Sequence, residues 1–237
     1  MTKLKHKDAR KLIKKNEFRE IVEKIIDYSR RKTENVIIII VAVVVAAVAV
    51  PMFINSAKEK EIKAAQMLAR ADMIVTRPVI DSSEASRYGM FSSKEEKYES
   101  ALETYMQIIQ TYERTKTAAI AYLGAADAYY NKESYSEALE YYNLFLEKFP
   151  KHNLNQEGLS GRGYVYAQQG NYEAAAGDWE KMDESAITYY DTRIRLAEIY
   201  KEKGNEEKFK ELLKNTAEKR PGTYWAGLAQ EKIKRDN

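Results

Sequence analysis

Few residues of this chain have the types and spacing that chemistry requires. Three glycines, Gly158, Gly161 and Gly163, crowd into the short run EGLSGRG, and a glycine-rich loop can cradle a phosphate. Such a loop follows a strand and precedes a Lys-Ser or Lys-Thr pair, and neither feature occurs in this part of the sequence. Close packing of two helices explains Gly163 better than phosphate binding does.

Tyrosines and carboxylates offer no better case for catalysis. Sixteen of the eighteen tyrosines lie between Tyr98 and Tyr224, but a base-stacking platform also needs a basic surface, which this region lacks. Carboxylates such as Glu133, Glu137 and Glu140 recur on faces expected to meet solvent. No pair of acids with an isolating apolar pocket is recognisable, so we expect no enzyme and no small-molecule substrate.

Metal, thiol and disulfide chemistry have no basis in the composition. The chain has no cysteine, which excludes disulfides, thiolate zinc sites, a cysteine nucleophile and a lipid-modified cysteine. Its two histidines, His6 and His152, are far apart and lack the spacing of metal ligands. We therefore expect no metal and no cofactor.

The charge is unevenly distributed along the 237 residues, whose formal net charge is +3. Residues 1–35 hold 12 Lys or Arg against 6 Asp or Glu, whereas residues 56–237 hold 27 against 30. The large C-terminal region is therefore slightly acidic. Because phosphate neutralisation needs a concentrated basic face, we expect no nucleic-acid binding.

The segment 36–54, VIIIIVAVVVAAVAVPMFI, is free of charged and polar side chains. As a helix it would extend for about 28 Å, close to the roughly 30 Å of a bilayer hydrocarbon core. Pro51 lies near its outer end, where a lost backbone bond is more easily accommodated. The sequence predicts a transmembrane helix over residues 36–54.

Retention and orientation of this helix are separate questions. Ala47-Val48-Ala49 resembles a signal-peptide cleavage site, but the 35-residue leader and the long apolar run favour a retained anchor. The basic tail, with Arg30-Arg31-Lys32 beside the helix, favours a cytoplasmic N-terminus. We expect a single pass through the inner, cytoplasmic membrane, with the large domain periplasmic or otherwise extracytoplasmic.

The tail, residues 1–35, carries apolar residues at helical spacing between its basic ones: Phe18, Ile21, Val22, Ile25 and Ile26. Such a partly amphipathic helix can lie on an anionic inner leaflet. A solvated helix explains the same pattern, and the sequence does not separate the two.

Residues 56–237 contain internal repeats. Ala101, Ala138 and Ala175 are each the fifth residue of a similar hexapeptide and are 37 residues apart. A period of this length made of helix pairs indicates a solenoid. Small residues recur where antiparallel helices approach, and a tyrosine follows three residues after each small residue of the first helices. The predicted packing positions are Ala101, Ala126, Tyr129, Ala138, Gly163, Tyr166, Ala175, Ala197 and Tyr200.

The run Ala126, Tyr129, Tyr135, Ala138, Tyr142 and Pro150 resembles a tetratricopeptide repeat, and Gly163 to Trp179 and Ala197 to Pro221 resemble further copies. The resemblance covers residues 94–223 and implies an all-α, right-handed helical solenoid. It departs from the family at Phe145 and Met182, where alanine is usual. We further expect an apolar stripe from Ile62 to Val75 in the first helix pair, a long loop over residues 77–96 and a capping helix over residues 224–235.

In tetratricopeptide domains the first helices of successive repeats line a concave groove for peptides or partner helices. Carried over to this chain, the resemblance implies a partner-binding groove that contains Asp127, Tyr130, Asn131, Tyr164, Gln168, Glu198 and Lys201. Simple exposure on a helix surface is the alternative for each of them. Leu123, Ser160 and Ile194 stand where members that bind a C-terminal carboxylate have basic or amide groups, so that binding mode is not expected.

The layout as a whole, a basic tail, one membrane helix and three to four repeats, is similar to the YfgM-type ancillary proteins of the bacterial Sec translocon. That similarity implies a chaperone-like accessory that meets unfolded chains and translocon subunits in the periplasm. A structural scaffold of a cell-envelope machine, for outer-membrane assembly, division or a motor, is the alternative. Fold alone does not identify a partner.

Overall fold

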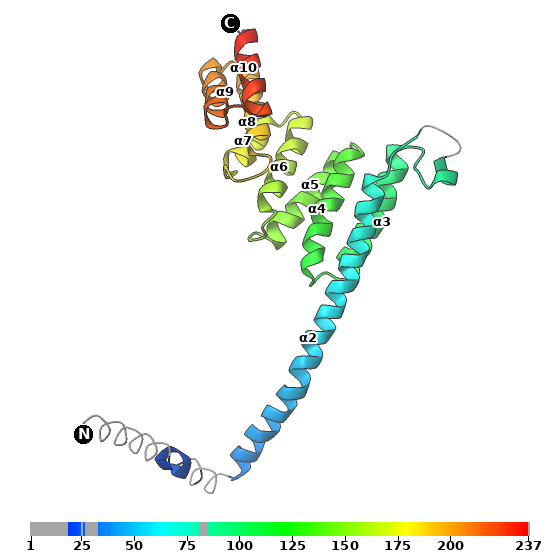
Figure 1. Cartoon of the computed structure of the whole chain (residues 1–237), viewed down its shortest axis with the longest axis vertical. Helices are drawn as coiled ribbons and strands as arrows, with labels where there is room; N and C mark the ends of the chain where they lie inside the picture. The colour runs from blue at the N-terminus through cyan, green and yellow to red at the C-terminus, as the bar shows by residue number, and fades with distance from the viewer. Residues whose placement is uncertain (1–18, 25, 27–32, 81–84, 237) are drawn as a thin grey trace, which may run out of the picture. The chain divides into compact units, whose positions relative to one another are not determined.

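The computed structural model describes residues 19–24, 26, 33–80 and 85–236 (Figure 1). Within these residues the chain is helical and contains no strand, which confirms the predicted all-α class. His6, Phe18, Ile25 and the Arg30-Arg31-Lys32 cluster lie outside the described residues. The elements are α2 (Thr33–Thr76), a 3-10 turn η1 (Ala85–Tyr88), α3 (Lys94–Thr111), α4 (Lys116–Asn131), α5 (Tyr135–Lys148), α6 (Asn155–Gln168), α7 (Tyr172–Glu180), α8 (Tyr189–Glu202), α9 (Glu206–Lys219) and α10 (Tyr224–Asp236).

The chain divides into two units, residues 1–58 and 59–237. In the first unit the apolar side chains of α2 from Ile37 to Ile54 are exposed, and Pro51 lies inside the helix. Among the described residues α2 is the helix that is long and apolar enough to cross a membrane. The described part of the tail includes a helical turn over residues 19–24, in which Ile21 is exposed.

The second unit begins with the remainder of α2, which packs against α3. Ala64 and Ala71 are fully buried there, next to Ala101 and Ile108 of α3. The buried stripe begins at Ala64, two residues later than predicted, because Ile62 is 58% exposed. The face that meets α3 instead has the spacing of one helical stripe: Ala64, Met67, Leu68, Ala71, Ile74 and Val75.

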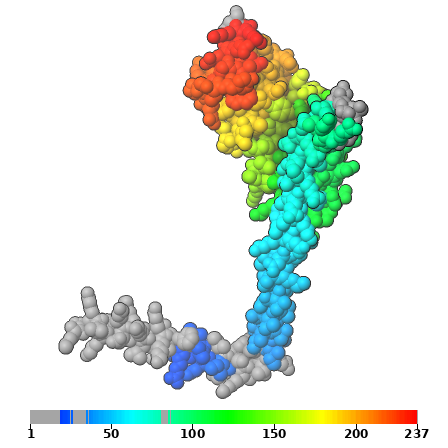
Figure 2. Space-filling model, turned by 45° about the vertical axis from the view of Figure 1, so that its right-hand side comes forward, coloured from blue at the N-terminus to red at the C-terminus, as the bar shows by residue number. Residues whose placement is uncertain are grey.

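Three helix pairs follow, α4 with α5, α6 with α7 and α8 with α9, and α10 packs on α9 (Figure 1). Figure 2 shows the surface of these repeats, coloured from green at α4 to red at α10. Each pair is joined by a three-residue turn whose middle residue has a positive φ: Glu133 at 61°, Gly170 at 74° and Gly204 at 72°. These equivalent turns set the helices of each pair antiparallel. The result is the predicted tetratricopeptide-like helical repeat.

Glycines of α6 receive aromatic rings from both neighbouring helices. A Cβ on Gly161 would lie 2.3 Å from the Tyr142 ring of α5, and one on Gly163 would lie 2.2 Å from Nε1 of Trp179 in α7. Trp179 is fully buried and donates from Nε1 to the Ser160 carbonyl at 3.1 Å. The EGLSGRG run therefore serves close helix packing, as expected for Gly163.

Gly158 makes room for an unusual neighbour in the same way. Phe145 is fully buried although the repeat family usually has alanine there, and a Cβ on Gly158 would lie 2.8 Å from its ring. The large residue on α5 is thus matched by the absence of a side chain on α6.

A buried ion pair joins α6 to α7. Arg162 donates from Nε and an Nη atom to the two carboxylate oxygens of Asp178, each at 2.7 Å, and its other Nη atom donates to Asn143 of α5 at 2.7 Å. Asp178 is only 3% exposed. Its charge is compensated inside the protein, as buried carboxylates require.

The loop after α2 ends earlier than predicted. Helix α3 begins at Lys94, so the connection covers residues 77–93 rather than 77–96. Ser93 Oγ accepts from the Glu96 amide at 3.0 Å, and Glu96 accepts from the Ser92 amide at 2.9 Å. This reciprocal cap starts the helix inside the segment that is predicted to be a loop.

Candidate partner-binding groove

A pocket of about 290 Å³ lies between α4 and α6. Its wall includes three of the predicted groove residues, Asp127, Tyr130 and Tyr164. The remaining lining residues come from the same two helices, from α5 and from the segment before α8: Leu123, Tyr142, Glu157, Ser160, Gly161 and Thr188. We call this space the α4–α6 pocket.

A second pocket of about 260 Å³ is lined by α2, α3 and α4 and shares Leu123 and Asp127 with the first. Asn131, another predicted groove residue, lines it, and its Nδ2 donates to the Asp127 carbonyl at 2.7 Å. The other lining residues come from α2, α3 and α4: Asp72, Val75, Tyr98, Tyr105, Ile120, Leu123, Gly124 and Ala128. Two adjoining pockets thus follow α4.

Asp127 is the acidic centre of both pockets. Its carboxylate accepts a hydrogen bond from the Tyr142 hydroxyl. Asp127 is exposed to solvent along the pocket, but neighbouring protein atoms crowd its carboxylate. This desolvation raises the pKa of Asp127 to about 6, against the smaller, opposing effect of the Tyr142 hydrogen bond. The same surroundings raise the pKa of Tyr142, through desolvation first and then through the Asp127 charge.

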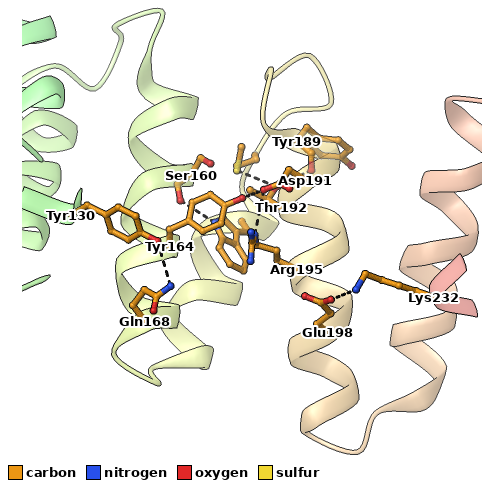
Figure 3. A network of polar contacts seen from close by, with 12 residues as sticks. Tyr130, Ser160, Tyr164, Gln168, Tyr189, Asp191, Thr192, Arg195, Glu198 and Lys232 are labelled. Atoms are coloured by element: carbon orange, nitrogen blue, oxygen red, sulfur yellow. Dashed lines mark hydrogen bonds and ion pairs between the residues drawn. The ribbon is translucent and has the colours of Figure 1, made fainter. Parts of the chain in front are cut away.

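The wall of the α4–α6 pocket is braced by polar contacts (Figure 3). The Tyr164 hydroxyl donates to Asp191 of α8, and Arg195 pairs with the same carboxylate at 3.4 Å while lying over the Tyr164 ring at 5.1 Å. On the α4 side, Gln168 donates from Nε2 to the Tyr130 hydroxyl at 3.4 Å. Asp191 is therefore occupied by its own neighbours.

The two predicted groove residues of α8 form ion pairs with residues of α10. Glu198 accepts from Lys232, and Lys201 pairs with Asp236 while lying 4.9 Å from the Phe209 ring (Figure 3 shows the first pair). The capping helix α10 brings opposite charges to both positions. Both side chains are committed to contacts within the chain.

Polar atoms without partners gather at the α4–α6 pocket. Among the described side chains, buried polar atoms that lack a hydrogen-bond partner include Oε2 of Glu157 and Oγ1 of Thr188, and both residues line this pocket. Buried polar groups are normally satisfied, so a concentration of exceptions at one cavity is informative. No cluster of three or more His, Asp or Glu side chains suited to a metal ion occurs among the residues that the structure describes.

The predicted packing residues lie inside the repeats. Ala101, Ala126, Ala138, Ala175 and Ala197 have no exposed surface, and Gly163 is buried against Trp179. The three tyrosines are partly buried: Tyr129 stacks on Tyr141 with ring centroids 5.4 Å apart, Tyr166 packs beside the Trp179 cluster, and Tyr200 donates to Glu180 at 2.5 Å.

Comparison with known proteins agrees with this architecture. Residues 94–153 match the tetratricopeptide repeat family. A putative kinesin light chain of Podosopora anserina with TPR-like repeats superposes with a TM-score of 0.54 at 14% identity, over 73% of this chain and 85% of that one. The fold is a tetratricopeptide-type helical repeat. The structure of MamA is a weaker match, with a TM-score of 0.46 and 18% identity over 58% of this chain and 79% of that one.

A curated relative with similar repeats is the photosystem I assembly protein Ycf3 of Cyanophora paradoxa. It is 29% identical over 114 residues, which are 47% of this chain and 64% of that protein. The chain thus covers less than two thirds of the relative's length. The likeness supports shared repeats rather than a shared task.

Some further residues of the pocket wall carry a signal in the tetratricopeptide register. Glu157 and Ser160 precede Tyr164 by seven and four residues, so they lie on the same face of α6. Leu123 precedes Asp127 by four residues on α4 in the same way. Tyr142 and Thr188 carried no such signal, because one belongs to a second helix and the other to an irregular connection.

Proposed function

We propose that this protein is a membrane-anchored, non-catalytic adaptor that holds segments of other proteins in the groove beside α4 and α6. The observation that carries the proposal is the α4–α6 pocket, whose wall combines Tyr130 and Tyr164 with two residues that have a polar atom without a partner in the chain. Aromatic rings with nearby polar groups suit peptide recognition, because the rings hold side chains and the polar groups bond the backbone.

Anchoring is supported by the first part of α2. Its apolar side chains from Ile37 to Ile54 are exposed, which is unfavourable in water and favourable in lipid. With the basic tail in the cytoplasm, the repeats are periplasmic or otherwise extracytoplasmic, attached to the inner membrane by one pass. There the adaptor serves as a chaperone-like accessory of the Sec translocon, consistent with its YfgM-type layout.

A scaffold of one envelope machine is the second candidate. The relative Ycf3 is by name an assembly protein, and an assembly role implies a stoichiometric client rather than many unfolded chains. The occupied C-terminal part of the groove, where Glu198 and Lys201 are paired with α10, favours a short recognised segment and therefore suits this candidate too.

Photocrosslinking in intact cells tests the groove and separates the candidates. A photoreactive amino acid replaces Tyr130 in the groove or, as a control, Ser136, which is exposed on α5. A ladder of products from position 130 supports the translocon accessory, and one dominant product supports the scaffold. Equal products from both positions, or none from position 130, contradict a binding groove.

Topology is tested with the cysteine-free chain. Ser136→Cys introduces a single thiol at an exposed site, and a membrane-impermeant maleimide is added to spheroplasts. Labelling of intact spheroplasts supports extracytoplasmic repeats. Labelling only after lysis contradicts that location and the translocon role with it.

A further inference from the structure

We propose that the α4–α6 pocket binds the cationic side chain of a Lys or Arg residue in an extended segment of the partner protein. The inference rests on the proposed groove function and names the chemistry of its occupant. It predicts partner segments that are basic, whereas the basic clamps of repeat domains that bind C-terminal carboxylates recognise the opposite charge.

The pocket wall carries negative charge without a counter-ion. Asp127 and Glu157 both line it, and among the described residues no Lys or Arg lines this pocket or the one that adjoins it. Within the described part of the chain, neither carboxylate forms an ion pair with a basic side chain. Asp72 adds a third carboxylate in the adjoining pocket. A cation is the ligand that this wall lacks.

Other carboxylates near the groove show what a compensated acid looks like in this fold. Asp178 has Arg162, Asp191 has Arg195 and Glu198 has Lys232. Each of these three carboxylates is therefore paired with a basic side chain of the same chain. The absence of a base at Asp127 and Glu157 therefore distinguishes the pocket from its surroundings.

The remaining wall also suits a cation. Tyr130, Tyr142 and Tyr164 line the pocket, and a tyrosine ring attracts an ammonium or guanidinium group placed over its face. The chain itself uses this interaction at the rim, where Arg195 lies over Tyr164. The apolar stem of a Lys or Arg could pack on the rings while its charged end reaches the carboxylates.

The two unsatisfied atoms that belong to residues of the pocket wall are acceptors, or can act as acceptors. Oε2 of Glu157 accepts hydrogen bonds when ionised, and Oγ1 of Thr188 can accept as well as donate. A Lys ammonium or an Arg guanidinium supplies several N–H donors and no acceptor. A volume of about 290 Å³ is just below the roughly 300–1,000 Å³ typical of drug-sized ligand pockets, which suits one long side chain.

Fluorescence anisotropy with the full chain in nonionic detergent tests the proposal. The probes are three labelled dodecapeptides that are identical except at three positions, which are all Lys, all Gln or all Glu. We expect the Lys peptide to bind about tenfold more tightly than the Gln peptide and the Glu peptide to bind most weakly. Asp127→Asn and Glu157→Gln should each weaken binding of the Lys peptide about three- to tenfold.

Glu137→Gln is the matched control, because Glu137 is exposed on α5 outside the pocket and loses the same charge. It should change the affinity less than about twofold. Glu157→Gln also protects the test against misfolding, since Asp127→Asn alters a residue bonded to Tyr142. Thermal melts of all variants verify folding.

The outcomes separate the inference from the function on which it rests. Equal affinities for Lys and Gln peptides, with crosslinks still formed from position 130, overturn the cation site and leave the groove intact. Equal weakening by Glu137→Gln also overturns it, since the attraction would then be diffuse. If none of the three peptides binds and position 130 forms no crosslinks, the proposed function is overturned as well.

Discussion

The two ends of the predicted groove differ in whether their polar residues are already occupied. On α4 and α6, Asp127 and Glu157 have no base beside them among the described residues, and the space they line is a pocket. On α8, Glu198 and Lys201 occupy the equivalent side of the repeat but pair with Lys232 and Asp236 of α10. On α8 the neighbouring helix α10 therefore decides whether these polar side chains are available.

The largest expected effect comes from removing α10, the helix that pairs with Glu198 and Lys201. A chain that ends at Thr223 lacks α10, which contributes Ala226 and Ala229 to the buried core. We expect the free energy of unfolding of the repeats to fall by roughly 2–4 kcal/mol, because the apolar face of α9 loses its cover. Urea unfolding followed by circular dichroism measures the loss.

If the truncated chain remains folded, a photocrosslinker at Lys201 should gain partner products that the full chain does not give. Lys232→Ala is the control, since it keeps α10 and removes one partly exposed ion pair, which contributes about 1 kcal/mol or less. Unchanged products from position 201 after truncation contradict the idea that α10 closes this end of the groove.

The second prediction concerns α6, the helix that carries Glu157 of the pocket wall. Gly163→Ala places a Cβ 2.2 Å from Nε1 of the fully buried Trp179, so α6 and α7 must separate or the indole must move. We expect a loss of about 1–3 kcal/mol in thermal or urea unfolding. Gly177→Ala in α7 is matched to it, because its Cβ meets nothing within 4 Å. Equal losses in the two variants would show that helix packing at Gly163 is not responsible.

The sequence predicted the scaffold better than it predicted the site. The helix pairs and the membrane-length helix follow from periodicity and composition, both local properties of the chain. The site depends on which elements meet. Tyr142 reaches the pocket from α5, Thr188 from an irregular connection, and Lys232 reaches Glu198 from α10. No spacing along one helix encodes such contacts, so the sequence pointed to Asp127 but could not predict that Glu198 and Lys201 pair with α10.

The third prediction concerns how the affinity for the Lys peptide depends on pH. Asp127 has a pKa of about 6, so it becomes fully charged only above that value. Affinity for the Lys peptide should rise several-fold between pH 5 and pH 7.5, and the rise should be absent in Asp127→Asn. The titratable groups that surround Asp127 are Asp72 of α2, Tyr98 and Tyr105 of α3, Tyr130 of α4, Tyr142 of α5, and Glu157 and Tyr164 of α6.

The same shift has a consequence for stability with a definite sign. The folded chain keeps the Asp127 proton up to about pH 6, whereas an unfolded chain loses it near the ordinary value of 3.8. Stability should therefore fall as the pH rises through this window, and Asp127→Asn should remove that part of the slope. Carboxyls with a lowered pKa, such as Glu61 and Glu184, act in the opposite direction at lower pH. A pH series in urea that shows no difference between the two chains contradicts the desolvated Asp127.

The smallest expected effect concerns the turn that follows α4, where the repeats also differ from one another. Glu133 has a φ of 61° at the place where the next two repeats have Gly170 and Gly204. A residue with a side chain is strained in this conformation, so Glu133→Gly should raise the free energy of unfolding by about 0.5–1 kcal/mol, and Gly170→Ala should lower it by a similar amount. Thermal melts decide the sign. Because Glu133 is not among the residues that line either pocket, affinity for the Lys peptide should stay within about twofold of the parent chain. A stabilised variant with weakened binding would instead mean that the strained turn helps to hold Asp127 in place. Recognition of the Lys peptide would then depend on this turn as well as on the unpaired charges of Asp127 and Glu157.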